Sequence, residues 1–121
     1  MFLHGHMQNA YVTRDLDRAM ELVGNRYGVE KFDRFDPDMT VNTLHGPQPM
    51  VNRVASFWAG GLNIEIIEPV SGYIEHYTCM LPEDRTDATP RFHHIVTKRL
   101  FIYIHHRSFL QRQRPAANNL R

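Results

Sequence analysis

The chain has 121 residues, of which 42% are hydrophobic and 22% are charged, so it can bury a modest core as one domain or one module and is not disordered overall. It has no apolar run near the roughly 20 residues that a membrane helix needs, and its start is too short and too polar for a signal peptide, so we expect a cytoplasmic protein with no membrane partner. The net charge of +1 hides a break, because residues 1–87 carry 7 Lys/Arg and 13 Asp/Glu whereas residues 88–121 carry 7 Lys/Arg and no acid.

The first predicted elements are a strand at residues 8–13 and a helix that begins after Asp15. Asp15 is a good N-cap, because its carboxylate can accept hydrogen bonds from the N–H groups of the first turn. Apolar residues then recur at helical spacing, and Gly28 is suited to end the helix in a left-handed conformation. The stripe predicted to be buried consists of Leu16, Ala19, Met20, Val23 and Tyr27.

Three further strands are predicted after this helix. Residues 29–35 alternate weakly and predict a second strand, residues 36–49 contain prolines and predict a loop, and residues 51–58 predict a third strand. A Gly-Gly turn joins the third strand to a fourth in a hairpin. Residues 71–91 predict a long mobile loop of the kind that often acts as a lid, and residues 92–97 begin another strand that could continue further.

The fourth strand carries a carboxylate among apolar side chains. In the run Leu62-Asn63-Ile64-Glu65-Ile66, a period of two places Glu65 on the face opposite the leucine and the isoleucines. A buried carboxylate without a partner costs several kcal/mol. One interpretation, the simpler one for this stretch alone, is that this face is exposed to solvent. The other is that Glu65 binds a metal ion.

Three motifs follow one another over about residues 8–97: QNAYVTRDLDRAMELV, AGGLNIEIIEPVSG and RFHHI. Their order and spacing resemble the glyoxalase/bleomycin resistance protein/dioxygenase superfamily, also called the vicinal oxygen chelate proteins. The resemblance implies an α+β fold, in which a βαβββ module with a curved mixed sheet pairs with a second module into a half-open barrel around a divalent metal ion. Residues 1–91 would form the first module, and residues 92–121 the start of a second module followed by an atypical basic tail.

The resemblance implies three metal ligands by position: Gln8 from the first strand, Glu65 from the fourth, and His94 from the first strand of the second module. The family more often has a histidine where Gln8 stands. An amide oxygen, a carboxylate and an imidazole suit Zn²⁺, Ni²⁺, Co²⁺, Mn²⁺ or Fe²⁺ without choosing among them. The alternatives are a surface amide for Gln8 and a hydrogen-bonded core histidine for His94, with His93 on the other face as a structural residue.

The end of the chain departs from the family pattern. After His94 only 27 residues remain and none of them is acidic, so the helix, the strands and the fourth ligand of a second module have no counterpart. Either a second copy of the chain completes the barrel as a homodimer, or residues 97–121 are a frameshifted or truncated second module. The bare sheet edges of a single module favour dimerisation in both cases.

The resemblance implies a metal-dependent isomerase, lyase or dioxygenase that acts on a small oxygen-bearing substrate. The metal would be a Lewis acid that stabilises an enolate or oxyanion, and Glu65 would double as the catalytic base. One alternative is a metal-free, bleomycin-resistance-like protein that binds an apolar or cationic molecule on its concave face through Tyr11, Phe57 or Trp58. Another is an inactive remnant. The basic tail could contact phosphate, but no nucleic-acid-binding motif is present, so nucleic acid is not an expected partner.

Overall fold

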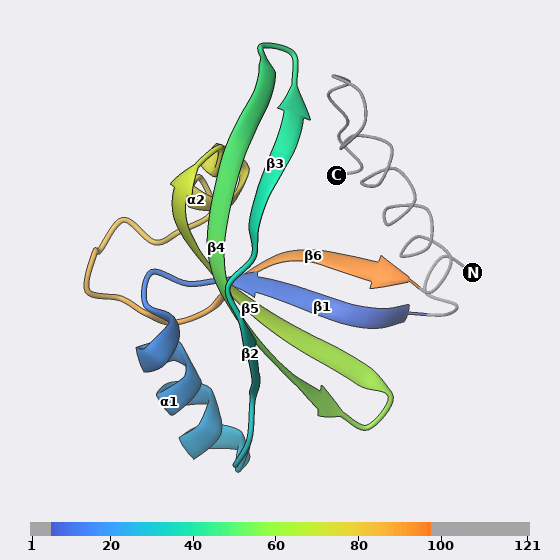
Figure 1. Ribbon diagram of the computed structural model, residues 1–121. Coiled ribbons are helices and arrows are strands. Elements are labelled where there is room, and N and C mark those ends of the chain that lie inside the picture. Colours follow the sequence, from blue (N-terminus) through green and yellow to red (C-terminus); the bar gives the residue numbers. More distant parts are fainter. Residues whose placement is uncertain (1–5, 98–121) are drawn as a thin grey trace.

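The computed structural model describes residues 6–97, with side chains from Met7 onward. Within this range the chain has an α+β fold, in which two helices accompany an open, curved, mixed sheet of six strands (Figure 1). The elements in chain order are β1 (His6–Val12), α1 (Leu16–Tyr27), β2 (Asp33–Phe35), β3 (Asp38–Thr43), β4 (Gly46–Ala59), β5 (Leu62–Gly72), α2 (Glu75–Thr78) and β6 (Arg91–Thr97). The basic tail and the predicted continuation of the last strand lie outside the described residues. Neither described helix is long and apolar enough to cross a membrane.

The strand order is β2-β4-β5-β1-β6, and β3 also pairs with β4. β1 runs parallel to β5 and antiparallel to β6, whereas β4 pairs antiparallel with each of its neighbours. The expected mixed sheet is therefore present. β1 lies between β5 and β6, so three segments that are distant in sequence are adjacent in the sheet (Figure 1).

Helix α1 begins and ends where its local signals predict. The side chain of Asp15 accepts a hydrogen bond from the backbone N–H of Arg18 at 3.1 Å, and Gly28 ends the helix with a φ of 70°. Leu16 and Ala19 are buried in one hydrophobic cluster with residues of the sheet. Tyr27, the last residue of the predicted buried stripe, is instead 69% exposed, because the helix ends there and its ring lies beside an open groove.

The prediction of a loop at residues 36–49 is wrong, because this segment forms β3 and the first part of β4. The two strands make a hairpin that extends away from the rest of the sheet (Figure 1). Pro49 is tolerated within β4, since its carbonyl accepts from the N–H of Tyr73 at 2.7 Å and so points away from β3. The nitrogen of a strand residue points the same way as its carbonyl, so the missing proline N–H removes no bond to β3. β2 is also shorter than predicted.

The two faces of the sheet carry different layers. On the face that we call the α1 face, α1 packs against Ala55 and Ile66, with Met20, Val23 and Phe32 at the margin. On the opposite face a second cluster contains Ala10, Val12, Val54 and Ile67, with Tyr77 and Leu81 packed on it. Strand alternation therefore places Glu65 on the opposite face, away from Ile64 and Ile66, as the sequence predicts.

Candidate metal centre

The register of β1 brings the three predicted ligands onto one face of the sheet. Ala10 pairs with Glu65 of β5 on one side and with His94 of β6 on the other, so these two residues flank β1 with Cα atoms about 10 Å apart. Gln8 lies two residues before Ala10 and therefore points to the same face, at about 7 Å along the strand. Gln8, Glu65 and His94 thus form a triangle across three adjacent strands.

The carboxyl group of Glu65 lies in surroundings that disfavour its charge. The side chain is partly buried, and this burial raises the pKa of the Glu65 carboxyl above its ordinary value of 4.5. No hydrogen bond or ion pair from the described residues 6–97 reaches it. A cation placed beside this carboxylate would supply the compensating charge that the described residues do not supply.

The side-chain amide of Gln8 is held in one orientation by Asn63. Nε2 of Gln8 donates to Oδ1 of Asn63 at 2.9 Å, and Nδ2 of Asn63 donates to the backbone carbonyl of Phe57 at 3.4 Å. With its nitrogen turned toward Asn63, Gln8 presents its carbonyl oxygen Oε1 on the other side of the amide. This oxygen is the only atom of a glutamine side chain that suits a metal ion.

His93 lies beside His94, which corrects the prediction that it points to the other face. The register between β1 and β6 shifts at this position, since Ala10 pairs with His94 and Tyr11 pairs with Phe92. The bulge inserts His93 as an extra residue in β6, and an inserted residue breaks the alternation of side chains. Nδ1 of His93 is consequently 2.7 Å from Nδ1 of His94.

Residues 73–90 lie over one end of the opposite face and are fastened to it, whereas the sequence predicts a mobile loop. The Oγ1 of Thr13 donates to the carbonyl of Ala88 at 2.7 Å, and the guanidinium of Arg14 donates to the carbonyl of Pro82. Within this segment the short helix α2 places Tyr77 against His93, with ring centroids 5.0 Å apart. The segment therefore helps to form the site.

The three predicted ligands offer donor types that divalent metals accept, and three donors make up only part of a coordination sphere. An imidazole nitrogen, a carboxylate and an amide oxygen together suit borderline transition metals. No group of three or more His, Cys, Asp or Glu side chains within residues 7–97 is placed to hold a metal, so a site here depends on the amide of Gln8. Structural zinc sites take four protein ligands and catalytic ones take three with a place for substrate or water.

Two residues that shape the site are missing from the sequence-based prediction. Asn63 precedes Glu65 by two positions, so the same period-two argument places it on the same face and could have indicated it. No local signal in Arg91-Phe92-His93-His94-Ile95 marks the bulge that brings His93 to the site. The contribution of α2 is also absent from the prediction, because the sequence indicates no helix there.

Two of the three aromatic residues predicted to bind a ligand, Tyr11 and Phe57, do not lie on the face that the sequence analysis predicts. Tyr11 pairs with Ile66 and Phe57 pairs with Ile64, so both belong to the α1 face rather than to the opposite face. Together with Trp58 they line an open groove of about 1320 Å³ between the sheet and the second half of α1. Trp58 lies at the end of β4 and is 58% exposed.

Comparison of the sequence with models of known protein families finds no match, and comparison with curated proteins finds none either. Membership of the glyoxalase-like superfamily therefore stays a prediction from the sequence motifs.

Proposed function

We propose that the chain is a glyoxalase-like, metal-dependent enzyme module that acts on a small oxygen-bearing substrate as an isomerase, lyase or dioxygenase. The observation that carries this proposal is the placement of Gln8, Glu65 and His94 on one face of three adjacent strands. The raised pKa of the Glu65 carboxyl supports it, because a buried acid that no residue of the described part of the chain pairs with is expected at a cation site.

In this proposal Oε1 of Gln8, the carboxylate of Glu65 and a ring nitrogen of His94 hold a Zn²⁺, Ni²⁺, Co²⁺, Mn²⁺ or Fe²⁺ ion. When bound, the ion would polarise a substrate oxygen and stabilise the negative charge that develops on it. Glu65 would also be the base that takes a proton from the carbon beside the substrate carbonyl.

We propose further that a second copy of the chain completes the half-open barrel. In the described part of the chain β6 is a terminal strand of the sheet, and three donors on one face leave room for atoms from another surface. Pairing of two copies would cover the open strand edge and would bring further donor atoms to the site. Light scattering should then give twice the mass of the 14.2 kDa chain. A monomer that binds one metal ion per chain would rule out this part of the proposal.

The proposal is tested by calorimetric titration of the purified protein, stripped with chelator, with each of the five metal ions. We expect at least one ion to bind with a dissociation constant of about 1 µM or lower. The double variant Glu65→Gln, His94→Ala should lose this binding. The matched control is Glu21→Gln with His45→Ala, which removes one exposed acid on α1 and one exposed histidine in the β3–β4 turn, both away from the site. Absence of binding to the wild type, or equal binding by both double variants, would contradict a metal site at these residues.

The groove on the α1 face favours a second candidate function, which is metal-free binding of an apolar or cationic molecule. Tyr11, Phe57 and Trp58 all line this groove, and aromatic rings bind both kinds of ligand. Trp58 is the only tryptophan, so its fluorescence reports on this groove directly. A shift caused by a small aromatic cation but by no metal ion would favour this function. A folded protein that responds to neither would indicate an inactive remnant.

A further inference from the structure

The ring of His93 joins a backbone carbonyl to the ring of His94. Its Nε2 lies 2.7 Å from the carbonyl oxygen of His76, and its Nδ1 lies 2.7 Å from Nδ1 of His94. Both distances are those of hydrogen bonds. The carbonyl belongs to α2, whereas both rings belong to β6, so this chain of contacts connects the covering segment to the candidate metal ligand.

When both rings are neutral, the chemistry of these groups determines which ring nitrogen carries each hydrogen. A carbonyl oxygen only accepts, so Nε2 of His93 must carry the hydrogen. A neutral imidazole has a single N–H, and Nδ1 of His93 is therefore an acceptor. The hydrogen between the two rings must then come from Nδ1 of His94. In this tautomer the lone pair of His94 is on Nε2.

We propose that His93 is a positioning residue that holds His94 in the tautomer with its hydrogen on Nδ1 and its lone pair on Nε2. A histidine that binds a metal usually donates its other N–H to a carboxylate, a carbonyl or a water, which fixes both the tautomer and the plane of the ring. Here Nδ1 of His93 accepts that hydrogen. Nε2 of His93 in turn donates to the carbonyl of His76, which holds the ring of His93 in place. The ring of Tyr77, whose centroid is 5.0 Å from that of His93, packs beside it.

The amide of Gln8 is held in the same manner, which supports this interpretation. Gln8 donates to Asn63, and Asn63 donates to the carbonyl of Phe57, which leaves Oε1 of Gln8 as the donor atom. Two of the three candidate ligands are thus oriented by a neighbouring side chain that is itself bonded to the backbone. In each case the atom that suits a metal ion is the one not used by the neighbour.

The tautomers can be measured directly by long-range ¹H–¹⁵N correlation of the imidazole nitrogens in the metal-free protein. The spectrum is recorded well above the ordinary imidazole pKa of about 6.5, so that both rings are neutral. We expect His94 to carry its hydrogen on Nδ1 and His93 on Nε2. A wild-type spectrum that shows His94 with its hydrogen on Nε2 overturns the proposal, and this result does not depend on any variant.

Two substitutions at position 93 separate positioning from packing. His93→Phe keeps a ring but no acceptor, so His94 should lose its preference for the Nδ1 hydrogen. His93→Gln can accept through its oxygen and donate through its nitrogen, so it should keep the tautomer. The control His45→Ala removes an exposed histidine in the β3–β4 turn and should change nothing. Equal tautomer populations in the Phe and Gln variants would contradict the proposal.

The role of this tautomer in metal binding rests on the proposed function and has its own measurement. We expect His93→Phe to weaken binding of the tightest metal ion by about 10- to 100-fold, and His93→Gln to weaken it much less. If the wild type shows the expected tautomers but binds no metal, the metal function fails and the positioning of His94 stands. If metal binds equally well to all three proteins, His93 has no positioning role in binding.

Discussion

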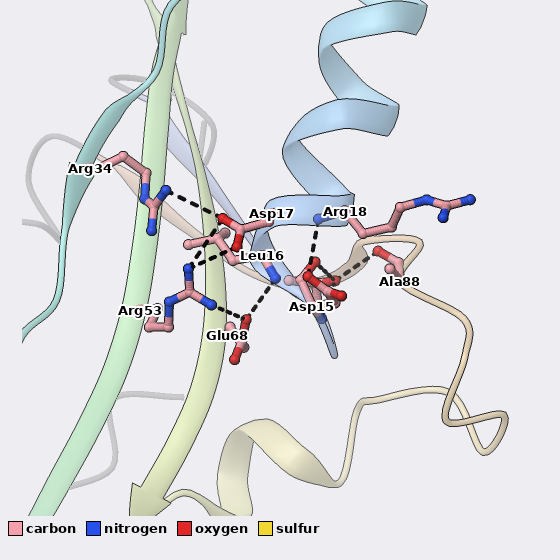
Figure 2. Close-up of polar contacts among 9 residues, drawn as sticks. Asp15, Leu16, Asp17, Arg18, Arg34, Arg53, Glu68 and Ala88 are labelled. Carbon is pink, nitrogen blue, oxygen red and sulfur yellow. Dashed lines mark hydrogen bonds and ion pairs between the residues drawn. The ribbon is translucent and has the colours of Figure 1, made fainter.

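Glu68 caps the first turn of α1 from a neighbouring strand: its Oε1 accepts the backbone N–H of Leu16 at 2.7 Å (Figure 2). The same oxygen is 3.2 Å from Nη1 of Arg53, and Nη2 of Arg53 contacts the carboxylate of Asp17 at 3.2 and 3.3 Å. The hydrogen bond to Asp17 is the main reason that the pKa of Arg53 is raised above its ordinary value. One cluster of charges thus fastens α1 to β4 and β5.

Replacing Glu68 should therefore destabilise the junction between α1 and the sheet. The Glu68 side chain is only 19% exposed, and loss of a partly buried, charged acceptor from a helix N-terminus costs about 1–3 kcal/mol. We expect Glu68→Ala to lower the free energy of unfolding in urea by this amount. Glu68→Gln keeps an oxygen for Leu16 and should cost less. An equal loss in both variants would show that the hydrogen bond to α1 contributes little.

The raised pKa of Glu65 makes stability depend on pH in a defined direction. Because its folded pKa lies above the ordinary 4.5, the folded protein holds this proton more tightly than the unfolded chain. The resulting stabilisation is complete below 4.5 and is lost as the pH rises through the folded pKa. Glu65→Gln cannot ionise, so its stability relative to the wild type should increase from acidic to neutral pH in the presence of chelator. A constant difference across this range would contradict the burial of the charge.

Gly72 should be among the positions least tolerant of a side chain. Its φ is 83°, and a Cβ there would overlap the backbone carbonyl of Pro49, whose oxygen also accepts from Tyr73. Gly60 is a matched control, since its φ is 64° but no atom lies within 4 Å of the added Cβ. We expect Gly60→Ala to cost about 1–2 kcal/mol and Gly72→Ala to cost at least about 4 kcal/mol. Similar chemical denaturation midpoints for the two variants would refute this difference.

The attachment of residues 73–90 can be tested at Thr13. The hydroxyl of Thr13 is buried and donates to the carbonyl of Ala88 at 2.7 Å. Thr13→Val has nearly the same shape but leaves that carbonyl without this donor, which costs about 1–3 kcal/mol. We expect limited proteolysis to cut the variant faster within residues 73–90, with Thr40→Val in β3 as an exposed control outside this segment. Unchanged cleavage would mean that other contacts hold the segment.

The parts of the fold that the sequence predicts are those with local causes. The bounds of α1 follow from Asp15 and Gly28, and the face of Glu65 follows from strand alternation, so each can be inferred from a few neighbouring residues. The β3–β4 hairpin is missed because its prolines indicate a break. Pro49 is compatible with a strand because its nitrogen points away from β3. This orientation depends on how the strands pair and not on the local sequence.

The candidate site shows the same limit. The resemblance implies that Gln8, Glu65 and His94 meet at one site, and the strand register puts the three residues on one face of the sheet. His93 is assigned to the wrong face, because a bulge depends on how β6 meets β1. Contacts with α2 join segments separated by many residues, and no pattern within either segment indicates them.

The most direct test of the central claim is to locate a bound cation by paramagnetic broadening with Mn²⁺ in substoichiometric amounts. If Gln8, Glu65 and His94 form a metal site, the backbone amide signals of these residues and of Ala10 between them should broaden first. Glu65→Gln should remove the effect while the fold is kept. Broadening centred on the exposed carboxylates of residues 83–87, or spread without a centre, would contradict a metal site on this face of the sheet.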